Sequence, residues 1–175
     1  MKILALDSAT KTGVAIGVAG ETPKLWTQVW RLDKQDGPPE IFGRALVWMA
    51  TILRDDPPDL VVIEQPIYSV AGNTTHQTTT IIQGLYGIFT GTVKAKGIEL
   101  LVAPIASWRK FALGHGRLKG DDAKRRMLAL CAHMGWPSED HNSAEAAGIW
   151  LWACSKKMPH LTHRTEPLFS GALDR

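Results

Sequence analysis

The sequence is short of cysteine, with two in 175 residues, Cys131 and Cys154. The two are far apart and lie in segments with a helical pattern. The chain therefore has neither a CxxC redox motif nor a thiolate metal site. We expect two reduced thiols in a reducing compartment.

Long apolar runs are also missing. The first seven residues lack the long apolar stretch of a signal peptide, and no other run is long enough to span a bilayer. We therefore expect a cytoplasmic protein with no membrane partner. With 45% hydrophobic residues and no internal repeats, the chain can bury one ordinary core. We predict one domain over residues 1–157 and a tail over 158–175, where no periodicity is visible.

The net charge is small, at +3, but it is unevenly distributed. The segment from Arg109 to Arg126 holds seven Lys or Arg residues against two Asp residues, a local charge of +5. The rest of the chain therefore sums to −2. A positive field confined to one stretch is typical of a surface that meets phosphate, although an ordinary solvated helix can carry the same charges.

The hydrophobic patterns predict an α/β fold. Apolar or β-branched runs predict strands, and helical spacing between Gly and Pro breaks predicts helices. The order, three strands, a helix, a strand, a helix, a strand and then helices, favours a mixed sheet flanked by helices. The expected strands are 2–7, 12–19, 24–31, 60–63 and 98–103, and the expected helices are 41–54, 77–96, 105–113, 121–134 and 143–155.

Two of these strands end in an acid. Asp7 follows Ile-Leu-Ala-Leu, and Glu64 follows the uniformly apolar Leu60 to Ile63. If the two strands are parallel neighbours, their ends lie about 4.8 Å apart, so the two carboxylates converge. Converging carboxylates repel one another unless a divalent ion lies between them, and oxygen ligands select Mg²⁺ or Mn²⁺ over zinc.

A third polar group precedes a helix of small residues, in the segment Asp-His-Asn-Ser-Ala-Glu-Ala-Ala-Gly from Asp140 to Gly148. Asn142 and His141 lie three and four residues before Glu145, so either can share a helical face with it. Alanine and glycine let such a helix approach a sheet closely, and its first turn can then add one to three metal ligands. Asp140 is equally well placed to cap the helix.

These three motifs resemble those of RuvC-type Holliday junction resolvases, in the ribonuclease H-like superfamily. They are Leu-Ala-Leu-Asp ending at Asp7, Val-Ile-Glu-Gln-Pro around Glu64, and Asn-Ser-Ala-Glu-Ala around Glu145. The resemblance covers residues 1–153 in order and spacing. It implies a five-stranded mixed sheet in the order 3-2-1-4-5, a homodimer, and paired cuts in branched DNA during recombination, repair or phage DNA processing.

Taken residue by residue, the resemblance makes Asp7 and Glu64 the first two catalytic acids and metal ligands. Glu145 stands where the family usually has Asp. Three residues earlier, where the family has another acid, this chain has Asn142. The fourth ligand therefore stays open among Asp140, His141 and Asn142, and Asp140 is the expected catalytic acid of the three.

The resemblance also implies two Mg²⁺ ions per site, with Mn²⁺ as a substitute. Such ions activate water and stabilise the leaving 3′ oxygen. Among the basic residues, Lys119 is the one expected to organise the scissile phosphate. Tyr68, shortly after Glu64, is expected to stack on an unpaired base. The residues expected to contact DNA are Arg109, Lys110, Arg117, Lys119, Lys124 and Tyr68.

Three other functions compete with this interpretation. A related nuclease acting on forks, flaps or RNA would carry the same acids. An actin-like or sugar-kinase fragment also begins with a strand, an acid and a hairpin, but it needs a second glycine-rich phosphate hairpin for which the chain has no room. A catalytically weak DNA-binding homologue is suggested by Asn142 in place of an acid.

Overall fold

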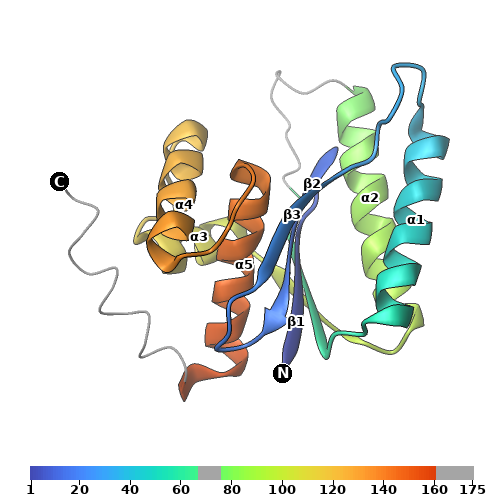
Figure 1. The fold of residues 1–175 in the computed structure, drawn as a ribbon. Coiled ribbons are helices and arrows are strands. Elements are labelled where there is room, and N and C mark those ends of the chain that lie inside the picture. Colours follow the sequence, from blue (N-terminus) through green and yellow to red (C-terminus); the bar gives the residue numbers. More distant parts are fainter. Residues whose placement is uncertain (67–75, 161–175) are drawn as a thin grey trace.

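The computed structural model describes residues 1–66 and 76–160, and it forms a five-stranded sheet between two layers of helices (Figure 1). Tyr68 and most of the predicted tail lie outside the described residues. The strands are β1 (Lys2–Asp7), β2 (Lys11–Val18), β3 (Lys24–Val29), β4 (Leu60–Glu64) and β5 (Glu99–Ala103). The helices are α1 (Pro38–Asp55), α2 (His76–Ala95), α3 (Ile105–Leu113), α4 (Gly120–Met134) and α5 (His141–Lys157).

The predicted strand order is confirmed: the sheet runs β3-β2-β1-β4-β5. β1, β2 and β3 form an antiparallel meander, whereas β4 pairs in parallel with β1 and with β5. Each parallel pair needs a crossover connection, which α1 and α2 provide. The carboxyl ends of β1, β4 and β5 therefore meet at one edge of the sheet, where α3 begins after Pro104.

Helix α1 begins three residues before the expected start at Ile41. The break at Gly37-Pro38-Pro39 is in fact a helix start, because proline lacks the N–H that a first turn leaves unpaired. The Glu40 carboxylate accepts a hydrogen bond from the Gly37 N–H at 2.9 Å, which closes the turn.

Helices α1 and α2 cover one face of the sheet (Figure 1). Leu4, Leu6 and Ile63 point into this layer, where they join large side chains of both helices. Two tryptophans and a phenylalanine pack there, with the rings of Trp30 and Trp48 5.2 Å apart. Within the described residues, no helix is both long enough and apolar enough to cross a membrane.

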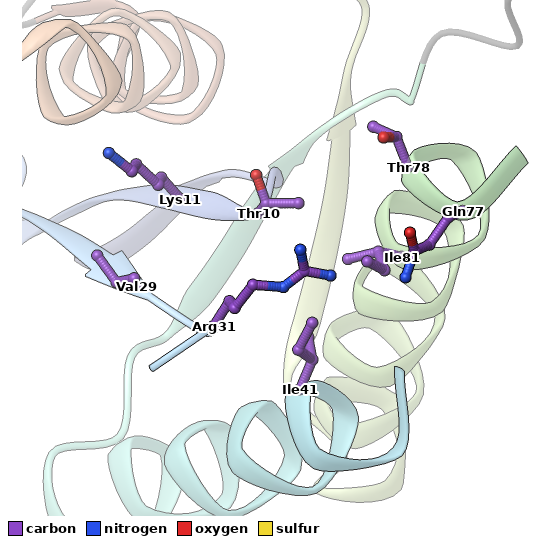
Figure 2. Close-up of a pocket in the computed structure, with 8 residues that line it drawn as sticks. All are labelled: Thr10, Lys11, Val29, Arg31, Ile41, Gln77, Thr78 and Ile81. Carbon is purple, nitrogen blue, oxygen red and sulfur yellow. The ribbon is translucent and has the colours of Figure 1, made fainter. Parts of the chain in front are cut away.

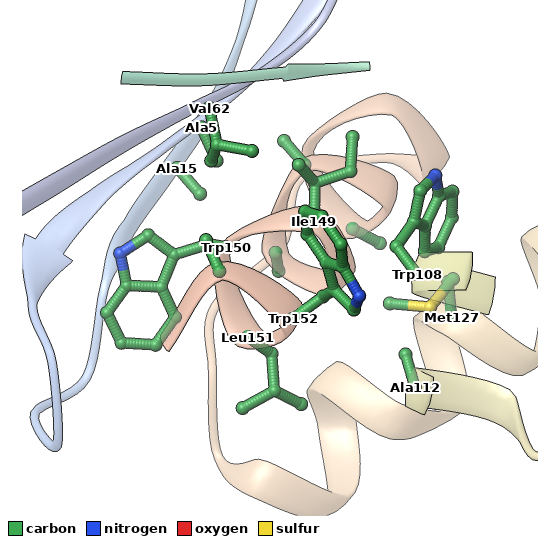
Figure 3. Packing of buried hydrophobic residues seen from close by; sticks show 14 of the residues in the cluster. Ala5, Ala15, Val62, Trp108, Ala112, Met127, Ile149, Trp150, Leu151 and Trp152 are labelled. Atoms are coloured by element: carbon green, nitrogen blue, oxygen red, sulfur yellow. The ribbon is translucent and has the colours of Figure 1, made fainter. Parts of the chain in front are cut away.

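The opposite face is covered by α5, with α3 and α4 outside it (Figure 1). Here the sheet presents Ala5, Ala15 and Val62, which are small enough for α5 to lie close (Figure 3). Its own Ala and Gly residues continue the close fit. A Cβ on Gly148 would come within 2.9 Å of Met127 and Trp108. This face is therefore where a helix can bring side chains to the sheet edge.

Candidate active site

Asp7 and Glu64 lie side by side at the carboxyl edge of the sheet. Leu6 pairs with Ile63 in the parallel register of β1 and β4, and the next pair along is Asp7 and Glu64. Side chains alternate between the faces of a strand. Since Leu6 and Ile63 face α1 and α2, both acids face the α5 layer. Asp7 is 8% exposed.

Glu145 reaches this edge because α5 begins directly on the sheet. Gly13 is the cross-strand partner of Asp7. A Cβ on Gly13 would lie 1.9 Å from the Asn142 carbonyl oxygen, so only glycine permits this approach. Glu145 follows one turn later and is 7% exposed. The structure thus brings Asp7, Glu64 and Glu145 together, and the charges of the two glutamates act on Asp7.

Helix α3 adds two donors to the three acids. The Trp108 indole Nε1–H donates to Glu64 Oε1 at 2.8 Å, and Arg109 Nη2 donates to Glu145 Oε1 at 2.9 Å. The Arg109 guanidinium also stacks on the Trp108 ring at 5.2 Å. Both residues come directly after β5 and Pro104, at the same sheet edge. We call these five residues the acid cluster: Asp7, Glu64, Trp108, Arg109 and Glu145.

The electrostatics of the cluster favour protonation. Burial raises the pKa of Asp7 well above its usual value, and the negative charges of Glu64 and Glu145 raise it further. The Asp7 carboxyl is hydrogen-bonded to Glu64, and Arg109 opposes the rise. Burial also raises the pKa of Glu64, against the hydrogen bond from Trp108. Burial and mutual repulsion therefore both favour protonation of these two carboxyl groups.

The donor set fits a hard divalent cation. Asp7 and Glu64 offer adjacent carboxylate oxygens with no nitrogen or sulfur ligand nearby, as Mg²⁺ and Mn²⁺ prefer. Among the described residues, however, no three His, Cys, Asp or Glu side chains converge tightly enough to hold an ion as they stand. Of the three acids, Glu145 has one oxygen bound to Arg109, whereas Asp7 and Glu64 form no ion pair among the described residues.

Asp140 caps α5 in this structure. Its Oδ1 accepts hydrogen bonds from the Ser143 N–H at 3.0 Å and from the Thr27 hydroxyl at 2.6 Å, and its Oδ2 accepts from the Asn142 amide. The carboxylate thus ties α5 to β3. His141 opens the helix beside it and is partly exposed. In residues 1–66 and 76–160, no side-chain hydrogen bond or ion pair joins Asp140, His141 or Asn142 to the acid cluster.

The basic residues expected to meet DNA divide into two groups. Arg109 lies in the acid cluster, with its side chain 19% exposed. Lys110, Arg117 and Lys119 are exposed around α3 and the start of α4, and Lys124 is half-buried on α4. Lys119 is the N-cap of α4, and the described residues show no contact between its side chain and the acids.

Sequence reasoning missed two members of the acid cluster. Trp108 belongs to no sequence motif described above, and Arg109 is predicted only as a DNA contact. A usable signal is that both lie in the first two turns of α3, the helix that follows a strand parallel to the two acid-bearing strands. Side chains at that position are delivered to the same sheet edge.

The fold, a five-stranded mixed sheet flanked by helices, is similar to that of several solved structures. Among solved structures it is similar to Thermus thermophilus RuvC, at 17% identity and a TM-score of 0.66, over 91% of this chain and 97% of that one. The same enzyme in complex with a Holliday junction substrate matches at 17% identity and a TM-score of 0.69, over 91% and 96%.

The yeast mitochondrial Holliday junction resolvase Ydc2 is a third match, at 13% identity and a TM-score of 0.58, covering 93% of this chain and 83% of that one. No protein-family model and no curated protein matches the sequence. The resemblance inferred from the three motifs is therefore confirmed at the level of the fold. The activity has to be argued from the site.

Proposed function

We propose that this protein is a structure-selective DNA endonuclease that cuts four-way junctions by divalent-metal-dependent hydrolysis. The observation that supports this most is the convergence of Asp7, Glu64 and Glu145 on the fold of junction-resolving nucleases. Burying three acids together is costly for a purely structural site. It is expected where a cation and a phosphodiester are to be bound.

In this proposal Asp7 and Glu64 would hold a divalent ion, and Glu145 would be a further ligand when it is not paired with Arg109. An ion held by these acids would supply an activated water and stabilise the leaving 3′ oxygen. Trp108 keeps the Glu64 carboxylate oriented through its indole N–H. Asp140 fixes the start of α5 and acts as a positioning residue. The products would carry 5′ phosphate and 3′ hydroxyl ends.

Arg109 has the geometry to change partners during this reaction. It rests on Glu145 in the absence of metal, its Nε has no hydrogen-bond partner among the described residues, and its side chain is partly exposed. A guanidinium released beside the acids would face the scissile phosphate, which it can bind with two N–H groups. Lys110, Arg117, Lys119 and Lys124 would extend this positive surface along the DNA.

A homodimer completes the proposal, since paired cuts across a four-way junction need two sites. A second candidate function, a DNA-binding homologue with little activity, is favoured by one observation. The ion pair between Arg109 and Glu145 neutralises an acid that catalysis needs. The two proposals differ in whether metal displaces Arg109.

The test compares labelled four-way junction, fork, flap and linear duplex in Mg²⁺ and in Ca²⁺. We expect the wild type to cut the junction in Mg²⁺. Asp7→Asn and Glu64→Gln should bind it and cut at least about 1,000-fold more slowly, because several kcal/mol of charge stabilisation are lost. The matched control is Glu21→Gln, which removes an exposed carboxylate remote from the cluster and should leave the rate unchanged.

Equal cutting of all four substrates would replace the junction assignment with a general branched-DNA nuclease. Tight junction binding without cutting by the wild type would favour the second candidate.

A further inference from the structure

A pocket opens at the same sheet edge as the acid cluster but on the opposite face of the sheet. It has a volume of about 390 Å³ and is formed by the β1–β2 turn, the end of β3, and the first turns of α1 and α2 (Figure 2). Ile41 and Ile81, which line it, belong to the core between the sheet and those helices. We call it the Arg31 pocket, lined among others by Thr10, Lys11, Arg31, Ile41, Gln77 and Ile81.

The Arg31 guanidinium points into this pocket (Figure 2). Among the described residues, no acid lines it. Of the two acids that follow Arg31 closely in sequence, Asp33 accepts a hydrogen bond from the Gln35 N–H, and Asp36 is bound by Arg44 through contacts of 2.5 and 3.0 Å. Within residues 1–66 and 76–160, Arg31 therefore has a cationic head in a concave site and no ion-pair partner. The ammonium of Lys11 points away from Arg31 in Figure 2, so only its stem contributes.

The rest of the lining is apolar and amide-bearing. Ile41 and Ile81, which are 1% and 2% exposed, form the inner part of an apolar wall, and Val29, 38% exposed, adds to it. Gln77 and Thr10 carry neutral donors and acceptors beside this wall. A volume near the lower end of small-molecule sites, with one cation, an apolar wall and an amide, suits a nucleotide. The phosphate would meet Arg31, the base would meet the isoleucines, and Gln77 would bond the edge of the base.

The pocket is also within reach of the strand being cut. Thr10 follows Asp7 by three residues, so their Cα atoms are at most about 11 Å apart along the chain. A strand lying across the sheet edge from the acid cluster arrives at the Arg31 pocket within a few nucleotides.

We propose that the Arg31 pocket binds one unpaired nucleotide of the DNA strand that crosses the acid cluster. This rests on the proposed nuclease function and adds to it a place where the enzyme contacts a base. The acids act on a phosphodiester common to every sequence, whereas a pocket for one base makes cutting depend on strand geometry and base identity.

The experiment measures binding by fluorescence anisotropy with two labelled probes, a 12-residue oligo(dT) and an abasic oligonucleotide of the same length and charge. Arg31→Gln removes the cation, and Gln77→Leu removes the amide at similar volume. Lys34→Gln is the matched control, since Lys34 is exposed in the loop after Arg31 and does not line the pocket.

We expect the wild type to prefer oligo(dT) by about fivefold, because the abasic probe leaves the isoleucine wall uncovered. Gln77→Leu should reduce that preference. Arg31→Gln should weaken the binding of both probes. It should also reduce the magnitude of the slope of log K against log salt by about one, the value for one lost phosphate contact. Lys34→Gln should change neither quantity.

Equal binding of both probes by the wild type would overturn the nucleotide pocket, as would equal effects of Arg31→Gln and Lys34→Gln. Junction cutting by the wild type is measured separately. If the wild type cuts the junction but either of these two binding results is obtained, the nuclease function stands and the nucleotide pocket is rejected. If the expected binding pattern is obtained but the wild type does not cut, the pocket stands and the nuclease function is rejected.

Discussion

Arg44 and Arg109 both bind carboxylates, and the surroundings of these two arginines differ in one respect. Arg44 meets a single acid, Asp36, with two hydrogen bonds, and a third goes to the Trp30 carbonyl at 3.0 Å. The hydrogen bond from Arg44 and backbone N–H groups hold the pKa of Asp36 well below its usual value. Arg109 meets three acids and bonds directly to one of them.

The charge balance separates the two clusters. Around Arg44 the one carboxylate that is hydrogen-bonded to the guanidinium, Asp36, has a lowered pKa, and Asp33 and Glu40 act on the guanidinium through charge alone. Around Arg109 two carboxyl groups remain, and burial and mutual repulsion raise their pKa values. Unbalanced buried charge of this kind is characteristic of functional sites. An ion pair therefore indicates a functional site only when the other buried charged groups around it are taken into account.

The largest effect is expected where the acid cluster depends on a close backbone approach. Gly13→Ala places a Cβ 1.9 Å from the Asn142 carbonyl oxygen and must push α5 away. We expect a loss of about 3 kcal/mol in the free energy of unfolding and a roughly 100-fold loss of junction cutting. Thermal unfolding and cleavage rates measure both.

Gly91→Ala is the control, because no atom lies within 4 Å of its Cβ position. It should be neutral or stabilising, since alanine favours helices. Wild-type cutting by Gly13→Ala would show that the position of α5 is not what assembles the acids.

A smaller effect is expected from removing the counter-charge. Arg109→Gln leaves Glu145 buried without its partner, so we expect a loss of about 2 kcal/mol in EDTA. Because Glu145 is then free to bind a cation, Mn²⁺ should raise the Tm of this variant more than that of the wild type. Arg125→Gln, which breaks the exposed pair with Asp122, should leave Tm nearly unchanged.

Equal Mn²⁺ shifts for Arg109→Gln and wild type would contradict the idea that Arg109 and a metal compete for Glu145.

The smallest effect is expected on the pH dependence of Tm in EDTA, where Asp7, with its raised pKa, is compared with Asp36, with its lowered pKa. The raised pKa of Asp7 means that its contribution to stability is present at low pH and is lost as pH rises through that pKa. Asp7→Asn should therefore raise Tm at neutral pH by about 3 °C, equivalent to ~1 kcal/mol. The gain should disappear in acid.

Asp36→Asn should do the opposite. The lowered pKa of Asp36 gives stability that is present at neutral pH and lost as pH falls through that pKa. This variant should have a lower Tm at neutral pH, and the difference should shrink in acid. If Asp7→Asn and Asp36→Asn shift Tm in the same direction at neutral pH, the acid cluster carries no more unpaired charge than the Arg44–Asp36 pair does.

The elements were predictable because each has a strong local pattern. The β-branched run from Leu60 to Ile63 and the apolar runs in β1 and β2 define strands with little ambiguity. Helix α1 starts earlier than the predicted Ile41, because Pro38 and Pro39 suit a first helical turn as well as a break. Asp140 remained open because a capping acid and a ligating acid look identical in sequence.

The roles of Trp108 and Arg109 depend on where α3 lies, and no local pattern encodes that. Their partners are 44 and 36 residues away in the chain. The same holds for the Arg31 pocket, whose lining comes from four separate segments. The predicted dimer and the Lys119 role stay predictions, and Tyr68 lies outside the described residues.

By itself, the sequence determined the strands, the helices and the acids at the strand ends, because periodicity and residue type act over a few neighbours. Only the tertiary structure decided which acids lie close enough to repel one another and which are fully paired with hydrogen-bond donors or cations. That outcome depends on distances of 3 Å between residues far apart in the chain, and electrostatic energy falls too steeply with distance and exposure for spacing alone to reveal it.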